Sequence, residues 1–497
     1  MDPKLKKLRA QLTQIAKLGS ALALLSWDEE VNLGSKGHSF RGEVNAALAA
    51  DLHRQVTHPK FVQLVKELAK KQKPGRLTPD EQVIVRETWR DVERAQKLPV
   101  EFVEKMTKLT SKAFGIWAEA RQKSDFGLYL PVLTEMIELK RREAELMGYK
   151  KHPYDALLDG FEPDMTCQQL DELFLPLAKN LAGLVAEVKG LEQPTLPKVS
   201  YPIEIQKSLN REIAKSLGYD LDAGRIDASP HPFMTTIHPG DNRITTRYDE
   251  HDFWISTGSV IHEIGHALYE QGLPAKEYGN PLGEAVSLGI HESQSRMWEN
   301  FVGRSPQFCR YLHTLLVKYF GKTDIKYTPE QLYRRLNRIQ PGFIRVESDE
   351  VTYNLHIILR YEIEKKLIDG SLKPAELPAA WNEKVRRYLG LKVPSDALGV
   401  LQDVHWAHGA IGYFPTYCLG NVYAAQLYAD AEKTIPHLAA GYSKGDFRPL
   451  LRWLRTNIHA DGRRYRPAQL VEKVTGQPPD SKYLLSHLKE KVRLQTG

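Results

Sequence analysis

The chain has 497 residues and a net charge of +7, and 42% of its residues are hydrophobic and 26% charged. These fractions are ordinary for globular proteins and exclude a mainly disordered chain, a collagen-like fibre and a disulfide-stapled miniprotein. Basic and acidic residues are interspersed along the chain. We therefore expect a solvated surface of mixed charge and no nucleic-acid binding, which needs a basic stripe with stacking aromatics.

The cysteines and the start of the chain indicate the cellular compartment of the protein. Cys167, Cys309 and Cys418 are odd in number and widely spaced, which favours a reducing compartment over a disulfide framework. No apolar signal-peptide segment follows the basic N-terminus. No window approaches the roughly 18 apolar residues of a membrane span. The expected protein is soluble, cytoplasmic and independent of membranes.

Helix signals occur along much of the chain. Thr78 is suited to cap a helix that begins at Pro79, and Glu81 to bond back to the cap, which makes a capping box. The segment 328–331 repeats this device. Further helices are expected over 281–302, 345–364 and 422–431.

Strand signals cluster in one region of this helical pattern. The short β-prone runs 232–237 and 243–248 flank a turn signal at 238–242. The proline-rich stretch 191–202 predicts a surface connection before them. The fold class predicted from these patterns is mainly α, with a small hairpin or sheet edge.

The strongest chemical signal is the segment His262-Glu263-Ile264-Gly265-His266. On a helix, residues four apart share a face, so His262 and His266 can bind one metal ion. Glu263 can then reach a water on that ion and take its proton. Residues 257–259 offer caps for such a helix, and Gly272 offers an end. The alternative, two surface histidines with a chance glutamate, is weakened by the apolar neighbours.

A catalytic zinc also needs a third protein ligand. The helix expected over 281–302 offers four candidates, with Glu292 ahead by spacing: Glu284, His291, Glu292 and Glu299. Glu284 and Glu299 can equally be ordinary surface charges. Spacing alone leaves the choice open.

Six short motifs occur in order along the chain. They are His231-Pro232-Phe233, Asp241-Asn242-Arg243-Ile244-Thr245, His262 to His266, His291-Glu292-Ser293-Gln294, Ile344-Arg345-Val346-Glu347-Ser348-Asp349, and Gly399 to Trp406. Together they resemble the motifs of the M32 metallocarboxypeptidases, the carboxypeptidase Taq type. Ser348 departs from the family pattern, which usually has Ala there. The segments 25–28, 154–159 and 412–417 also look familial.

The resemblance implies a role for each matching residue. The ligands of one zinc ion per chain, which cobalt replaces in some members, would be His262, His266 and Glu292. Glu263 would be the general base and then the proton donor to the leaving amine. His405 and Tyr417 would stabilise the oxyanion, with Tyr413 as a rival to Tyr417.

Substrate binding is assigned to Tyr413 as well and to three further motif residues. Arg345 would grip the free C-terminal carboxylate, because a planar guanidinium binds a carboxylate bidentately. The alternative for Arg345 is a surface ion pair with Glu347 or Asp349. His231 and Arg243 are expected in the substrate cleft, although Arg243 can instead form a structural pair with Asp241. For His405 the alternative is a core histidine beside Trp406.

The resemblance also implies an architecture and an activity. The length alone allows roughly three domains, but the family implies one domain, 1–497, of the gluzincin kind, with two lobes and a deep central cleft. Residues 1–200 would form a cleft wall and 201–497 the catalytic part. The expected activity is a broad-specificity carboxypeptidase that spares proline, acting as a homodimer on peptides with a free C-terminus. Two alternatives remain, an endopeptidase or oligopeptidase and a non-catalytic peptide-binding protein.

Overall fold

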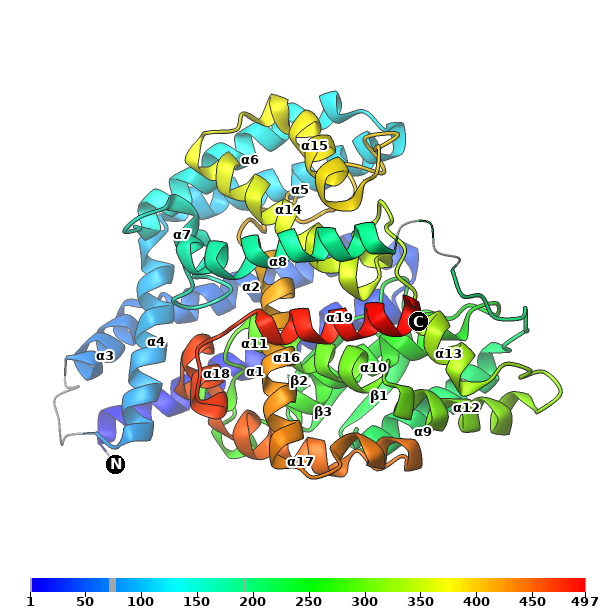
Figure 1. The fold of residues 1–497 in the computed structure, drawn as a ribbon. Helices are drawn as coiled ribbons and strands as arrows, with labels where there is room; N and C mark the ends of the chain where they lie inside the picture. The colour runs from blue at the N-terminus through cyan, green and yellow to red at the C-terminus, as the bar shows by residue number, and fades with distance from the viewer. Residues whose placement is uncertain (1, 71–76, 189, 191–192, 497) are drawn as a thin grey trace.

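Helices make up most of the computed structural model, which describes residues 2–70, 77–188, 190 and 193–496 (Figure 1). The helices before the strands are α1 Pro3–Val31, α2 His38–Val56, α3 Pro59–Ala69, α4 Pro79–Lys97, α5 Val100–Lys123, α6 Phe126–Met147, α7 Pro153–Leu158, α8 Cys167–Glu187 and α9 Ile203–Leu217. The strands are β1 Gly224–Ala228, β2 Met234–His238 and β3 Asp241–Thr246. The later helices are α10 Phe253–Glu270, α11 Leu288–Arg296, α12 Pro306–Phe320, α13 Pro329–Leu336, α14 Glu350–Asp369, α15 Leu377–Leu389, α16 Pro415–Thr434, α17 Arg448–Asn457, α18 Pro467–Thr475 and α19 Lys482–Thr496. The mainly α prediction is confirmed.

Both predicted capping boxes are confirmed. Thr78 accepts a bond from the backbone N–H of Glu81 at 3.3 Å, and Glu81 accepts one from the N–H of Thr78 at 2.9 Å. Thr328 and Gln331 form the same pair of bonds at the start of α13. These bonds satisfy backbone donors that lack an intrahelical partner.

The predicted hairpin is confirmed, and it belongs to a three-stranded sheet in the order β1-β3-β2. β2 and β3 are antiparallel, with Thr235 opposite Arg243. The side chain of Asn242 closes the turn by donating to the carbonyls of His238 and Pro239 at 3.2 and 2.9 Å. The parallel pairing of β1 with β3 was not predicted, because the segment 224–228 lacks a run of apolar or β-branched residues.

The start predicted for the helix of the histidine motif is wrong. α10 begins at Phe253, and Asp252 caps it by accepting from the backbone N–H of Trp254 at 3.0 Å. Thr257 lies inside the helix, where its hydroxyl donates to Asn210 at 2.8 Å. Residues 257–259 therefore do not cap the helix. The expected end near Gly272 is confirmed, since α10 stops at Glu270.

Two other helix predictions need correction. The segment 281–302 is not one helix, because α11 begins only at Leu288, with Ser287 as its cap, and passes into a π-helical turn, Met297–Val302. In the segment 345–364, Arg345–Glu347 is a short 3₁₀ turn and α14 follows it. Asp349 starts α14 by accepting two backbone N–H groups at 2.9 Å. The helix predicted over 422–431 lies within α16.

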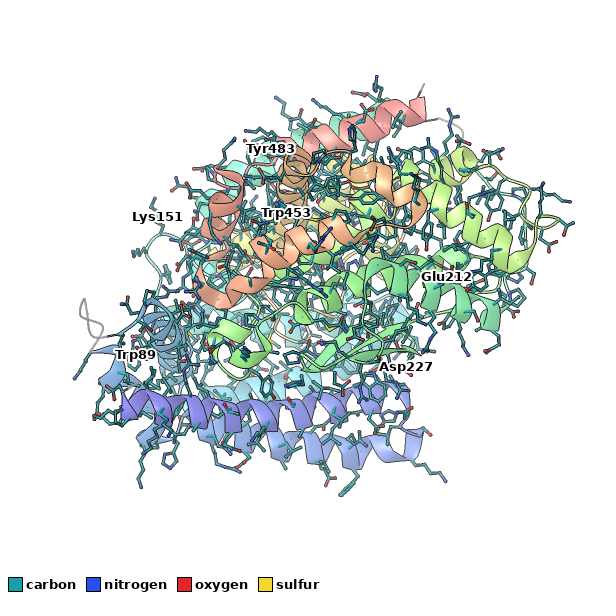
Figure 2. All side chains as sticks on the ribbon, turned by 90° about the horizontal axis from the view of Figure 1, so that it is seen from below. Trp89, Lys151, Glu212, Asp227, Trp453 and Tyr483 are labelled. Carbon is teal, nitrogen blue, oxygen red and sulfur yellow. The ribbon has the colours of Figure 1, made fainter. Side chains whose placement is uncertain are left out.

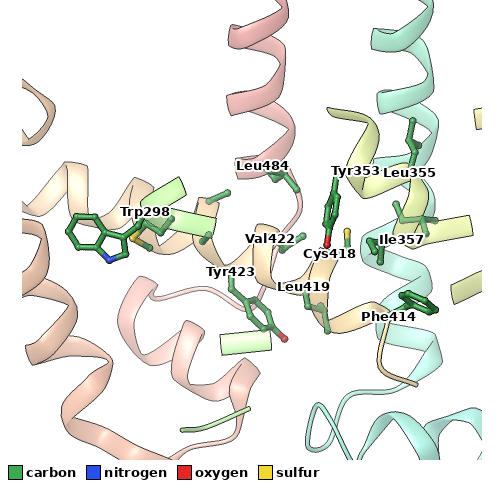
Figure 3. Packing of buried hydrophobic residues seen from close by; sticks show 14 of the residues in the cluster. Trp298, Tyr353, Leu355, Ile357, Phe414, Cys418, Leu419, Val422, Tyr423 and Leu484 are labelled. Carbon is green, nitrogen blue, oxygen red and sulfur yellow. The ribbon is translucent and has the colours of Figure 1, made fainter. Parts of the chain in front are cut away.

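The main hydrophobic core runs from Leu109 to Val492 and surrounds α16. Figure 3 shows Cys418, Leu419, Val422 and Tyr423 of this helix among the buried residues of the core. A smaller cluster joins α1, α3 and α4. α1 and α2 lie side by side along one face (Figure 2). The domain limits, the lobes and the deep cleft stay predictions. Among the described residues, no helix has the length and apolar character of a membrane span.

Candidate metal centre

Two glycines allow three helices to meet at the candidate site. A Cβ on Gly265 of α10 would lie 2.5 Å from Cα of Ser295 in α11. A Cβ on Gly420 of α16 would lie 2.5 Å from Cγ of Glu292. Such distances are far below van der Waals contact, so only glycine permits this approach. The close packing places Glu292 of α11 beside the histidine face of α10.

His262, His266 and Glu292 converge as the sequence predicts. Their ligand atoms all lie within 4.8 Å of one another. Oε2 of Glu292 lies 3.8 Å from Nε2 of His262 and 3.4 Å from Nε2 of His266. Tetrahedral zinc with ligands at about 2.0–2.2 Å separates neighbouring ligand atoms by about 3.4 Å. The His–His–Glu set therefore fits a divalent metal ion such as zinc in both chemistry and spacing.

The outward nitrogen of His262 is held by Glu299. Nδ1 of His262 lies 2.8 Å from Oε2 of Glu299, which also accepts from Arg296 at 3.2 Å. Arg304 donates to the other carboxylate oxygen of Glu299 at 3.1 Å. These contacts hold the pKa of Glu299 well below its usual range despite burial. The surface-charge alternative for Glu299 is wrong.

The supporting role of Glu299 was not predicted from the sequence. The available signal was its spacing from Glu292, since residues seven apart return to the same face of a helix. Glu284, another candidate ligand, pairs instead with Arg463 at 2.9 Å on the exposed side.

His291, the fourth candidate ligand, supports the site through its contact with the second histidine, His266. Its Nδ1 lies 2.6 Å from Nδ1 of His266, and its Nε2 lies 2.9 Å from Oε1 of Glu270. Metal-binding histidines usually donate their second N–H to a neighbouring acceptor. His291 therefore occupies the position of such an acceptor.

Glu263 follows His262 and is 7% exposed. Burial raises the pKa of Glu263 to about 7, and the carboxylates of Glu292 and Glu299 push it the same way, whereas His262 opposes the shift. A carboxyl group that titrates near neutral pH is suited to take up and return a proton.

Arg345 is buried and links the fifth motif to the sixth. Its Nε donates to Oδ1 of Asp403 at 3.0 Å, and its backbone N–H donates to Gln402 at 2.9 Å. The alternative of a surface ion pair with Glu347 or Asp349 is wrong, because Arg345 is only 6% exposed.

A chain of contacts connects Arg345 to the metal-ligand set. Nη1 of Arg345 donates to the hydroxyl of Tyr353 at 3.3 Å. Arg296 lies over the same tyrosine ring at 4.2 Å and donates to Glu292 at 2.7 Å. Two residues, Tyr353 and Arg296, thus link the proposed carboxylate binder to the proposed metal ligand.

Aromatic residues line the space beside Arg345. The guanidinium carbon of Arg345 lies 5.1 Å from the ring centre of Tyr417, and the hydroxyl of Tyr417 lies 3.4 Å from Nε2 of His405. The rings of Tyr413 and Tyr417 are 5.2 Å apart. Burial lowers the pKa of His405 to about 4 and raises the pKa of both tyrosines. All three side chains are therefore neutral near pH 7, and the tyrosine hydroxyls can donate hydrogen bonds.

His231 and Arg243 lie at the small sheet. Arg243 donates from two nitrogens to Asp241, each at 2.8 Å, and lies 4.2 Å from the ring centre of Trp27. This is the structural pair considered as the alternative for Arg243. His231 is exposed, and its carbonyl accepts from Ser229 at 2.6 Å.

Helices beside a small sheet carry the two histidines, the downstream glutamate and Glu263. This arrangement defines a helical metallopeptidase with the HEXXH motif. The chain belongs to the M32 family, since the family model, "Carboxypeptidase Taq (M32) metallopeptidase", matches residues 7–492. The resemblance found in the sequence is confirmed, and with it the class of metallocarboxypeptidase, a peptide hydrolase.

This chain is similar over nearly its full length to carboxypeptidases of known sequence and to solved structures. Thermostable carboxypeptidase 1 of Thermus thermophilus is 42% identical over 497 residues, which cover 97% of either chain. Carboxypeptidase 1 of Bacillus subtilis is 38% identical over 483 residues, covering 97% of this chain and 96% of that one. The crystal structure of an M32 carboxypeptidase from Deinococcus radiodurans R1 matches with a TM-score of 0.96 at 35% identity, covering 100% of both chains.

Proposed function

We propose that this protein is a zinc carboxypeptidase that removes one residue at a time from the C-terminus of peptides, with broad specificity except for proline. The observation that carries this function is a buried Arg345 that is linked through Tyr353 and Arg296 to Glu292 of the metal-ligand set. An enzyme that cuts only at chain ends must recognise a free carboxylate, and Arg345 provides the matching cation.

Arg345 has donor capacity left for that carboxylate. Its Nε and Nη1 are engaged by Asp403 and Tyr353, whereas within the described residues Nη2 has no hydrogen-bond partner. The two N–H groups of Nη2 are the donors proposed to bind substrate. The nearby ring of Tyr417 restricts the directions from which the carboxylate can approach.

Glu263 is the proposed general base. It takes a proton from the water that attacks the scissile carbonyl and later returns it to the leaving amine. A bound divalent ion would supply Lewis-acid polarisation of that carbonyl. Tyr417 and His405 are proposed to donate hydrogen bonds to the developing oxyanion, with Tyr413 as the rival donor. His231 and Arg243 are proposed to line the approach of the substrate.

The outer strand β2 is proposed to pair with the extended main chain of a peptide. It lies at the edge of the sheet, and the carbonyl of Ile237 in this strand accepts a hydrogen bond from the hydroxyl of Ser20 in α1. Main-chain pairing ignores side-chain identity and so supports broad specificity. A product complex without any contact to residues 231–247 would refute this role.

The test is a timed digest of a mixed peptide set, read by mass, with and without chelator. We expect ladders that shorten from the C-terminus, stop before proline, vanish with chelator and return with zinc or cobalt. Peptides with an amidated C-terminus should resist cleavage. Internal cuts in amidated peptides would instead show an endopeptidase, and no cuts at all a peptide-binding protein.

Location and assembly are proposed on separate grounds. The three cysteines are free and buried, which suits a reducing cytoplasm. A homodimer is proposed from the family resemblance. Sedimentation of the purified protein at micromolar concentration tests it, and a single species near the monomer mass of 56.6 kDa would refute it.

A further inference from the structure

The two histidines of the metal site are supported in different ways. His262 meets the carboxylate of Glu299, with Nδ1 and Oε2 2.8 Å apart. His266 meets another imidazole, with its Nδ1 2.6 Å from Nδ1 of His291. Two ring nitrogens at that separation form a hydrogen bond only if one carries a hydrogen and the other offers a lone pair.

The surrounding contacts fix which nitrogen carries each hydrogen. Nε2 of His266 faces Glu292 at 3.4 Å, on the side of the ligand set, and must offer its lone pair to a metal. Nδ1 of His266 therefore carries the hydrogen and donates it to His291. His291 must then carry its own hydrogen on Nε2, where Oε1 of Glu270 accepts at 2.9 Å.

Packing fixes the relative positions of His266, His291 and Glu270. Glu270 and His266 are four residues apart on α10 and so share a helical face, while His291 reaches across from α11. The ring of His291 lies 4.6 Å from that of His266 and 5.4 Å from that of Tyr269. Tyr269 is fixed in turn by accepting from the backbone of Val286 at 3.1 Å. His291 also directly precedes the ligand Glu292 in the chain. The hydrogen-bond relay His266–His291–Glu270 therefore helps to position two ligands, His266 and Glu292.

We propose that His291 is a positioning residue for the metal: its ring accepts from Nδ1 of His266, which fixes the tautomer of His266, and it keeps the carboxylate of Glu270 one ring away. Three carboxylates already meet at this centre, Glu263, Glu292 and Glu299. A fourth in direct contact with His266 would add negative charge beside the metal and weaken its Lewis acidity. The inference rests on the proposed metal site and not on the peptide-bond chemistry.

The test compares substitutions that remove different parts of the relay. His291→Phe keeps a ring but removes both nitrogens, whereas His291→Asn keeps an acceptor near the place of Nδ1. Glu270→Gln keeps an acceptor for Nε2. His152→Gln is the matched control, because His152 also bonds through both nitrogens, to the backbone of Tyr154 and to Asp369, and is 22% exposed against 17% for His291.

The readouts are the zinc dissociation constant, from competition with a chromophoric chelator, and the visible absorption of the cobalt-loaded protein. We expect zinc affinity to fall about 10–100-fold in His291→Phe, less in His291→Asn and less than about tenfold in Glu270→Gln. The cobalt bands should shift in His291→Phe, and His152→Gln should match the wild type. Thermal unfolding of each metal-free variant checks that it folds.

The proposal is overturned if His291→Phe binds zinc within twofold of the wild type, or binds it more tightly than His291→Asn. The second result would mean that the ring serves only as packing. If His291→Phe does not fold, His291→Leu, which also removes both ring nitrogens, is judged by the same twofold limit. A wild-type protein that binds zinc but cuts no peptide would refute the proposed function and leave this inference standing.

Discussion

Arg345 donates from Nε to Oδ1 of Asp403 over 3.0 Å, and both side chains are less than a tenth exposed. Arg360 donates to the other oxygen of the same carboxylate at 2.7 Å and is fully buried. An isolated Arg345–Asp403 pair would be neutral. With two guanidinium groups on one carboxylate, the cluster keeps a net positive charge that can attract the carboxylate of a substrate.

Replacing Arg345 by Met should remove discrimination for a free C-terminus. Charge-assisted hydrogen bonds to a carboxylate contribute about 1.5–3 kcal/mol, so kcat/KM should fall about 10–150-fold, mainly through KM. The preference for free over amidated peptides should fall by a similar factor. Steady-state kinetics on matched peptides measure both, with the exposed Arg142→Met as control. An unchanged preference would contradict the role of Arg345.

Replacing Asp403 by Asn should destabilise the fold. Two buried guanidinium groups would lose their shared counter-ion, and breaking a buried pair costs about 3–5 kcal/mol. Urea unfolding of the metal-free protein measures the change in the free energy of unfolding. Asp446→Asn, which breaks a largely exposed pair with Arg448, should cost less than about 1 kcal/mol. Equal losses of stability in the two variants would refute the role of Asp403 as a buried counter-ion.

Replacing Glu263 by Gln should abolish turnover and retain the metal. A positioned general base contributes about 10²–10⁴-fold to the rate. Since Glu263 is not in the ligand set, bound zinc measured by mass spectrometry should stay near one ion per chain. Turnover close to that of the wild type would rule out the role of Glu263, and loss of zinc would place Glu263 among the ligands.

Gly265→Ala should push α10 and α11 apart. The added Cβ would meet Cα of Ser295 at 2.5 Å, and overpacking of this kind costs about 1–3 kcal/mol. Zinc affinity should also fall, because Glu292 moves with α11. Gly183→Ala in α8 is the control, since a Cβ there meets nothing within 4 Å and should stabilise the helix by about 0.5–1 kcal/mol. A Gly265→Ala variant with the free energy of unfolding and the zinc affinity of the wild type would contradict the close packing.

Glu364 makes part of the stability pH-dependent. It accepts bonds from Tyr154, Trp406 and the backbone of Gly412 at 2.6, 2.8 and 3.1 Å, and so fixes the loop that carries His405. Burial raises the pKa of Glu364 from 4.5 to about 7. Between these two values the folded state keeps a proton that the unfolded state has lost, so this contribution to stability falls as pH rises.

The Glu364→Gln variant cannot titrate and should lack this slope. The stability difference between the wild type and this variant should therefore shift against the wild type by on the order of 3 kcal/mol from pH 4.5 to 7. Urea unfolding across that range measures it, with the exposed Glu101→Gln as control. A difference that stays constant within about 0.5 kcal/mol would contradict the prediction.

Much of the site was readable from the sequence because its signals are local. The spacing of His262 and His266 needs only one helical turn, and the capping boxes need only four residues. The turn at Asn242 was equally local. The helix starts at Asp252 and Ser287 were missed, because several residues in each segment can cap and tertiary packing selects one of them.

The sequence by itself determined the family, the helical class and the ligand candidates, since short-range periodicity and motif spacing encode them. Only the tertiary structure decided which distant groups meet. Glu299 was a ligand candidate with a surface charge as its alternative, Arg345 was expected to bind substrate or else to pair with Glu347 or Asp349, and His291 was one ligand candidate among four. Glu299 and His291 meet histidines of α10 across helix–helix contacts, such as the one that Gly265 permits. Arg345 meets Asp403 of a loop that is distant in the sequence. Such contacts depend on the backbone separation of packed helices, which no spacing along a single segment reveals.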